Sequence, residues 1–88
     1  MNELDKNNFA KKLLYQSLNR GYKENEIILG NFAKEFLRHM TLDEMYEFEK
    51  ILQESDADLY EWLMRKAPIP KRLDSKIMSK LFNFKTHL

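Results

Sequence analysis

The sequence predicts an all-α protein, a compact bundle of five short helices, and two observations carry that prediction. Apolar residues recur at three- and four-residue spacing along most of the chain, and no segment alternates with the period of a strand. Only two glycines and two prolines are present among 88 residues, which leaves little material for hairpins or long loops. We therefore expect a single helical domain over residues 1–88, with its last few residues frayed.

The first two helices are expected on either side of Gly21. Apolar residues repeat at helical spacing from about residue 6 to residue 19 or 20. Gly21 then ends this helix, because glycine takes the left-handed conformation without steric cost. A second helix is expected from about residue 24 to residue 39. Gly30 lies inside it, where glycine costs about 1 kcal/mol relative to alanine, so another element or a partner should pack closely there.

Three more helices are expected to follow. The third begins at Thr41, where the Thr41 hydroxyl and the Glu44 carboxylate can form a reciprocal capping box. Ser55 is a candidate N-cap for the fourth helix. The Ala-Pro-Ile-Pro run at residues 67–70 should end the fourth helix, since proline disfavours helical conformation at the residue before it. The fifth helix is expected from about residue 73 to residue 82.

Composition excludes several classes of protein. The chain has no cysteine, which excludes disulfides, thiolate nucleophiles and cysteine-based zinc sites. No run of about 18 apolar residues is present, so no segment should span a membrane. The first residues are polar and lack the apolar core of a signal peptide. We expect a cytoplasmic bacterial protein, or a protein of the mitochondrial matrix if it is a processed eukaryotic one.

Charge is distributed unevenly, although the net charge is only +1. Residues 41–61 hold eight acidic residues and one lysine, whereas residues 64–88 hold seven basic residues and one aspartate. We interpret both blocks as solvated helix faces; they could also attract each other within the fold or address partners. The basic block favours one alternative function, a small helical nucleic-acid-binding or regulatory domain that uses the basic C-terminal helix. A net charge near neutral is weak for engaging phosphates.

Neither catalysis nor metal binding is indicated. His39 and His87 lie at a helix end and near the C-terminus, and neither has an evident partner for a catalytic constellation. The acidic stretch around Asp56 and Asp58 lacks the spacing of a calcium loop, and we assign these two residues to the start of the fourth helix. We expect no catalytic residue and no metal site.

The strongest candidate for a binding site is the turn between the first two helices. Its R-G-x-x-E pattern puts a cation, a glycine and a carboxylate on one short turn. Each residue has a local structural explanation as part of a helix junction. In the functional interpretation, Arg20 and Glu24 project from one corner as hydrogen-bonding groups, and Gly21 lets the backbone of a partner approach closely. Tyr22 and Asp58 are assigned supporting roles.

The sequence around this turn resembles the succinate dehydrogenase assembly factor 2 family, the bacterial and mitochondrial flavinylation factors. Three segments carry the resemblance: the R-G-x-x-E turn, L-G-x-F at residues 29–32 and D-x-D-L-x-x-W-L at residues 56–63. The resemblance covers about residues 9–66, and residues 71–88 carry no signature of the family. It implies a five-helix fold and a non-enzymatic assembly chaperone.

The resemblance also implies a partner. Members of this family bind the flavoprotein subunit of succinate dehydrogenase, or of the related fumarate reductase, and promote covalent attachment of FAD to a histidine of that subunit. The contact with the flavoprotein maps onto Arg20, Gly21 and Glu24. Asp58 and Trp62 also match the family, and we assign Trp62 to the core. FAD would be carried by the partner, so we expect this chain to bind no cofactor stably. We also expect it to be a monomer that binds no nucleic acid and does not insert into a membrane.

Overall fold

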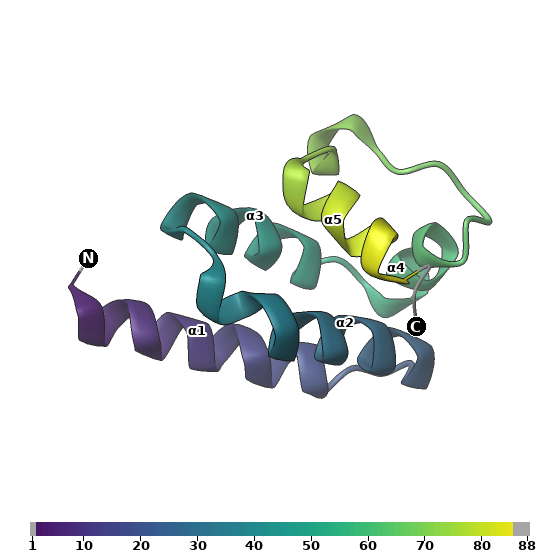
Figure 1. Cartoon of the computed structure of the whole chain (residues 1–88). Coiled ribbons are helices and arrows are strands. Elements are labelled where there is room, and N and C mark those ends of the chain that lie inside the picture. The colour runs from purple at the N-terminus through teal and green to yellow at the C-terminus, as the bar shows by residue number, and fades with distance from the viewer. Residues whose placement is uncertain (1, 86–88) are drawn as a thin grey trace.

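The first two helices form a pair along one side of the molecule. The computed structural model describes residues 2–85, in which α1 spans Glu3–Leu18 and α2 spans Lys23–Phe36. The two helices lie side by side, and the N-terminal end of α1 reaches past the other helices (Figure 1). A Cβ atom placed on Gly30 would lie 2.8 Å from Cδ2 of Leu18. The close packing predicted at Gly30 is therefore confirmed, and the neighbouring element is α1.

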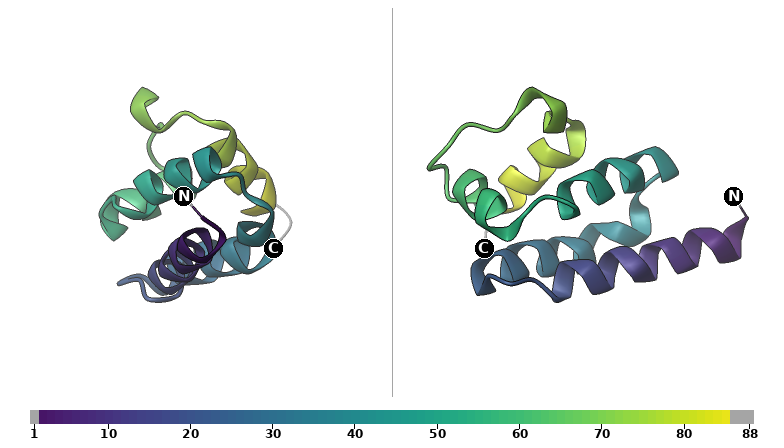
Figure 2. Two further views of the ribbon diagram at one scale, coloured as in Figure 1. Left: turned by 90° about the vertical axis from the view of Figure 1, so that its left-hand side faces the viewer. Right: turned by 180° about the vertical axis from the view of Figure 1, so that it is seen from behind.

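The remaining helices cover this pair. A short 3-10 turn, η1, continues α2, and the elements that follow are α3, α4, a second 3-10 turn η2, and α5. Their bounds are Leu37–His39 for η1, Leu42–Leu52 for α3, Asp56–Leu63 for α4, Lys71–Leu73 for η2 and Lys76–Lys85 for α5. Two turned views show α3 and α5 on the same side of the α1–α2 pair (Figure 2). Residues 2–85 contain five α-helices and no strand, which confirms the predicted fold class.

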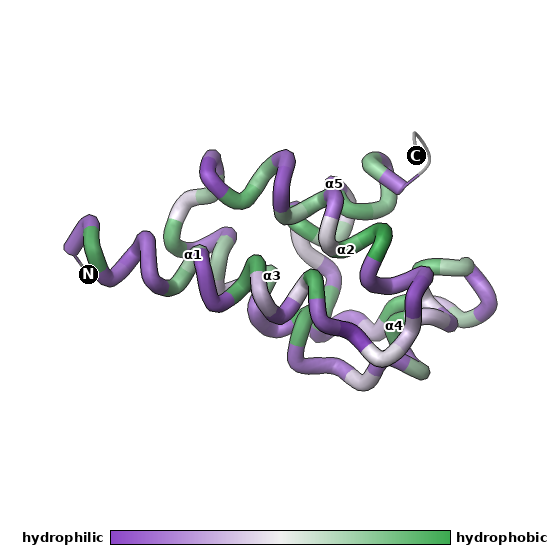
Figure 3. Tube along the Cα trace, turned by 90° about the horizontal axis from the view of Figure 1, so that it is seen from below, coloured by the Kyte–Doolittle hydropathy of each residue, from purple (hydrophilic) through white to green (hydrophobic). Residues whose placement is uncertain are grey.

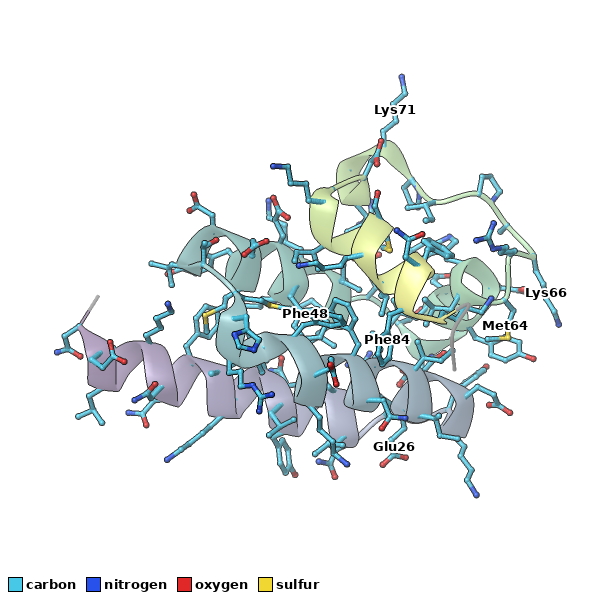
Figure 4. The ribbon with its side chains drawn as sticks, in the orientation of Figure 1. Glu26, Phe48, Met64, Lys66, Lys71 and Phe84 are labelled. Atoms are coloured by element: carbon cyan, nitrogen blue, oxygen red, sulfur yellow. The ribbon has the colours of Figure 1, made fainter. Side chains whose placement is uncertain are left out.

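The apolar core lies between the α1–α2 pair and the other helices. Phe32 of α2 is fully buried at its centre, and its ring centroid lies 5.6 Å from that of Phe48 and 5.7 Å from that of Phe84. Phe48 and Phe84 point into the space between α2 and the helices above it (Figure 4). Trp62 is buried, as predicted. The N-terminal part of α1, which extends past this core, is mostly hydrophilic (Figure 3).

Polar side chains start two of the helices where the sequence predicts. Thr41 and Glu44 form the expected capping box: the Glu44 amide donates to Oγ1 of Thr41 at 3.2 Å, and the Thr41 amide donates to Oε1 of Glu44 at 2.8 Å. Ser55 caps α4, since its Oγ accepts from the amide of Asp58 at 3.2 Å. These caps satisfy amides that have no partner inside their own helix.

Two other helices begin away from the expected positions. The first helix begins at Glu3 rather than near residue 6, because Oδ1 of Asn2 accepts from the amide of Asp5 at 2.8 Å and caps it. The last helix begins at Lys76 rather than near residue 73, because Oγ of Ser75 accepts from the amide three residues on at 3.1 Å. Both caps are single polar side chains that the apolar spacing does not reveal.

The predicted ends of the second and fourth helices are also corrected. The last residues of the second helix form the 3-10 turn Leu37–His39. The fourth helix ends before the prolines, because the chain turns at Arg65, whose φ is 58°. There the amide of Lys66 donates to the carbonyl of Glu61 at 2.8 Å, and the amide of Arg65 to that of Trp62 at 3.0 Å. This is a Schellman turn, in which glycine is usual and another residue costs about 1 kcal/mol.

The prediction for the end of the chain concerns residues that the structure does not describe. The expected fraying and the assignment of His87 fall on residues 86–88, outside the described range.

Candidate functional site

The predicted R-G-x-x-E turn lies against the beginning of α4. Residues 19–22 join α1 to α2. Arg20 and Gly21 of this turn, Asn25 in the first turn of α2 and Asp56 at the first position of α4 are connected by hydrogen bonds. We call these four residues the polar corner. It joins segments that are more than 30 positions apart in the sequence.

The guanidinium group of Arg20 points into the molecule, and its side chain is only 9% exposed. Its Nε donates to Oδ1 of Asp56 at 2.8 Å. Its Nη1 donates to the carbonyl of Leu52 at 2.8 Å, and its Nη2 to the carbonyl of Glu54 at 3.2 Å. A rigid fork of five N–H donors suits such a set of acceptors. Arg20 therefore ties the end of α1 to the connection between α3 and α4.

The carboxylate of Asp56 is the acceptor at the centre of the corner. It accepts from the amide of Gly21 at 2.7 Å, from Nε of Arg20 at 2.8 Å and from Nδ2 of Asn25 at 3.1 Å. Burial alone would raise the pKa of the Asp56 carboxyl, but these hydrogen bonds and the charge of Arg20 outweigh burial and hold that pKa below its ordinary value. The group is therefore a carboxylate at neutral pH. It starts α4, as predicted, and it also binds Arg20, Gly21 and Asn25.

Gly21 does not take the left-handed conformation that the sequence suggested, since no glycine in residues 2–85 has a positive φ. The first helix ends without it, because Nδ2 of Asn19 donates to the carbonyl of Tyr15 at 2.8 Å and satisfies the helix end. Glycine is instead favoured by a close approach: a Cβ on Gly21 would lie 3.2 Å from Oδ2 of Asp56, so a larger residue would push that carboxylate away. The close neighbour that the structure places at Gly21 belongs to the same chain.

Asn25 is the member of the corner that sequence reasoning missed. Its side chain is fully buried, and Nδ2 donates to the backbone carbonyl of Asp56 at 2.9 Å as well as to its carboxylate. One signal could have identified it. Asn25 precedes the apolar residues Ile28 and Leu29 by three and four positions, so helical spacing places it on the buried face of α2. A buried amide needs partners, which marks it as part of a hydrogen-bond network.

The other half of the motif faces outward. Glu24 is exposed, and no hydrogen bond or ion pair of its carboxylate is found within residues 2–85. Tyr22 is 40% exposed, and its ring centroid lies 5.5 Å from that of Tyr60. Ile27 is 48% exposed, and with Glu24 and Met64 it borders a mostly apolar depression of about 270 Å³. We call Tyr22, Glu24, Ile27, Tyr60 and Met64 the outer face. Met64 lies at the outer end of α4 (Figure 4).

The remaining candidates do not join the corner. Asp58 is exposed; its backbone amide donates to Ser55, and its side chain forms no hydrogen bond with the other residues of the range 2–85. His39 ends the η1 turn, and its Nε2 lies 3.2 Å from Nε of Arg38. No cluster of three or more His, Cys, Asp or Glu side chains that could hold a metal ion occurs in residues 2–85. Within the same residues, every helix is too short or too polar to cross a membrane.

The basic residues of the C-terminal third do not all lie on one face. Lys66 and Lys71 project from different sides of the molecule (Figure 4). Arg72 forms a double contact with Glu54, at 2.6 Å and 2.9 Å, which joins the basic and acidic blocks within the fold. A nucleic-acid surface needs a continuous basic patch or stripe, and the separation of the two lysines and the pairing of Arg72 with Glu54 argue against one.

The fold and the corner define a class. This is a small all-α protein whose polar corner is hydrogen-bonded from within and lies beside a partly exposed aromatic and apolar face. Its family follows from sequence comparison. The chain belongs to the Sdh5 family, described as "Flavinator of succinate dehydrogenase", which matches residues 11–85. The predicted resemblance is confirmed. The match also extends past residue 66 into the segment in which no signature was recognised.

Individual relatives carry matching names. The chain is 42% identical over 74 residues to "Succinate dehydrogenase assembly factor 2, mitochondrial" of Lodderomyces elongisporus, covering 80% of this chain and 45% of that protein. It is 33% identical over 78 residues to the protein of the same name in Dictyostelium discoideum, covering 89% and 54%. For that of Komagataella phaffii, identity is 40% over 75 residues, covering 81% and 40%. The chain thus spans about half the length of the curated relatives it matches.

Proposed function

We propose that this chain binds the flavoprotein subunit of succinate dehydrogenase, or of the related fumarate reductase, and promotes covalent attachment of FAD to a histidine of that subunit. One observation carries the proposal. In a chain of the Sdh5 family, the motif residues Arg20 and Gly21 are held in a single hydrogen-bonded corner, directly beside an exposed face that includes Glu24. The chain would be an assembly factor with no catalytic residue of its own.

The motif residues would have two different roles in binding. Arg20 and Gly21 fix the geometry of the corner through Asp56, and they would support binding by shaping the surface that meets the partner. Glu24 and Tyr22 lie on the outer face and would contact the flavoprotein directly, and Asp58 would have a supporting role. A surface fixed before binding loses less conformational entropy when the complex forms.

The chemistry would belong to the flavin and the flavoprotein. FAD is carried by the partner, and this chain, acting as a monomer, would hold no cofactor stably. Its contribution would be to keep the flavoprotein in a form in which the histidine lies in attack geometry against the methyl group of the isoalloxazine ring. Positioning alone can lower the barrier to such a step by several kcal/mol. The compartment would be the one in which the flavoprotein matures, bacterial cytoplasm or mitochondrial matrix.

Co-expression with a cognate flavoprotein subunit tests this function. Covalent flavin is followed as fluorescence of the flavoprotein band in a denaturing gel. The wild-type chain should give a strong band, and Gly21→Arg should reduce it at least about tenfold. The new side chain would meet Oδ2 of Asp56, since even a Cβ would lie 3.2 Å away, and it would add a second cation where Arg20 already binds.

Asn8→Arg is the matched control, because it adds the same charge at an exposed position in the N-terminal part of α1, away from the outer face. It should leave flavinylation unchanged. Flavin bands of equal strength for the wild type and Gly21→Arg, at equal amounts of soluble chain, would refute the proposed function of the corner.

A further inference from the structure

A second surface lies at the opposite end of α4 from the polar corner. A groove of about 750 Å³ runs between α5 and the connection from α4 to η2, which Figure 1 shows looping away from α5. We call it the α4–α5 groove. The residues that define its character are Trp62, Arg65, Lys66, Pro68, Ile69 and Phe82. Its volume falls within the range of about 300–1,000 Å³ typical of ligand-binding clefts.

The groove combines apolar walls with a cationic rim. Trp62, Ile69 and Phe82 supply aromatic and aliphatic surface. The guanidinium carbon of Arg65 lies 5.2 Å from the centroid of the Phe82 ring, and Lys66 also borders the groove. None of the residues that line the groove is an aspartate or a glutamate. A ligand that fits this lining carries apolar groups together with negative charge.

The backbone at Arg65 is a separate sign that its side chain matters there. Arg65 is the single non-glycine residue of positive φ in residues 2–85, at 58°. It occupies the position of the Schellman turn at which glycine would be free of strain. Strained backbone that carries a specific side chain is typical of ligand-binding sites. An arginine there places a planar fork over an aromatic wall, and such a fork pairs with a carboxylate through two parallel hydrogen bonds.

We propose that the α4–α5 groove binds an extended, acidic segment of a partner protein. Apolar side chains of the segment lie against Trp62 and Ile69, and its carboxylates pair with Arg65 and Lys66. Charge complementarity and the concave apolar walls favour a peptide over nucleic acid or an anionic membrane. Either of those would need a continuous basic surface, whereas Lys66 and Lys71 point in different directions (Figure 4).

Trp62 makes the proposal testable without a label, because it is the only tryptophan in the chain. The chain of residues 1–88 is titrated with three eight-residue peptides that share alternating Leu and Phe and carry Glu, Gln or Lys at the other positions. Trp62 emission is recorded, and isothermal calorimetry supplies the affinity. The Glu peptide should shift the emission and bind with a Kd of about 10–100 µM. The Lys peptide should bind at least about tenfold more weakly.

Arg65→Gly removes the guanidinium while retaining the turn, because glycine is the preferred residue at this φ. It should weaken binding of the Glu peptide about tenfold. It should not lower the melting temperature, because glycine relieves the backbone strain that arginine imposes on this turn. Lys71→Ala, which removes a cation that does not border the groove, should bind like wild type. Three results would each overturn the proposal: no binding of the Glu peptide up to about 1 mM, equal binding by Arg65→Gly, or equal or tighter binding of duplex DNA or phosphatidylglycerol vesicles.

Discussion

Replacing Asp56 with alanine is expected to lower the free energy of unfolding by about 2–4 kcal/mol. The substitution leaves the guanidinium of Arg20, whose side chain is 9% exposed, without its counter-charge. It also removes the acceptor of the Gly21 amide and one acceptor of Asn25. Urea unfolding at pH 7, followed by circular dichroism, measures the loss. A chain of this length has a total stability of about 4–13 kcal/mol, so the loss would be a large share of it.

Asp58→Ala is the control for this substitution, because Asp58 lies in the same first turn of α4 and is exposed. Both variants lose a carboxylate near the positive end of the same helix dipole, which is worth about 0.3–1 kcal/mol. Any excess loss in Asp56→Ala therefore reports on the corner. Equal losses in the two variants would show that the hydrogen bonds of the corner do not stabilise the fold.

The difference in stability between wild type and Asp56→Ala should depend on pH. The pKa of Asp56 is lowered in the folded chain, so its stabilising effect is present above the unfolded pKa, about 3.9, and is lost as the pH falls through the lower folded value. The stability difference between wild type and Asp56→Ala should be constant from pH 7 to about pH 5 and shrink below about pH 4. Glu44 and Glu54, whose pKa values are lowered by hydrogen bonds from Thr41 and Arg72, titrate in both proteins and cancel in the difference.

Phe32→Ala is expected to lower the free energy of unfolding by about 3–5 kcal/mol. The Phe32 side chain is fully buried, and its ring meets Phe36 at 5.0 Å, Phe48 at 5.6 Å and Phe84 at 5.7 Å between centroids. These rings come from the end of α2, from α3 and from α5, so no single neighbour can move to fill the cavity. The melting temperature, measured by scanning calorimetry, should fall by about 15–30 °C.

Tyr15→Ala is the control for the core substitution. Tyr15 is an aromatic residue of α1 that is 67% exposed, and its replacement should change the stability by no more than about 0.5 kcal/mol. If Phe32→Ala lost as little as Tyr15→Ala, the aromatic cluster would not be the centre of the core.

The parts of the fold that depend on local sequence were predictable. Apolar spacing located all five helices, and the T-x-x-E pattern identified the capping box of α3, because both signals come from residues within one or two helical turns. The close contact at Gly30 was predictable as well, since glycine within a helix is costly unless something packs against it. The end of α4 and the start of α5 were not, because a Schellman turn at Arg65 and a cap at Ser75 leave no periodic signal.

The corner was only half predictable, for a physical reason. The R-G-x-x-E pattern identified the turn, but the partner of Arg20 and Gly21 is Asp56, more than 30 residues away along the chain. No rule of helical spacing connects residues at that separation. The prediction that these residues face a partner protein therefore lacked one fact, which is that Arg20 is largely buried. The side chains that this region presents to solvent are those of the outer face, whereas the guanidinium of Arg20 points inward.

The most direct test of the proposed contact is the affinity of the chain for a purified, FAD-loaded flavoprotein subunit, measured by biolayer interferometry. Glu24→Lys, on the outer face, should raise the Kd at least about tenfold. The change costs α2 about 0.5–1 kcal/mol through the helix dipole, so the Glu24→Lys variant and the wild type both remain folded in the assay. Glu35→Lys, an equal charge change at an exposed position farther along α2, should bind like wild type. Equal affinities for Glu24→Lys and Glu35→Lys would contradict the assignment of the outer face as the surface that meets the flavoprotein.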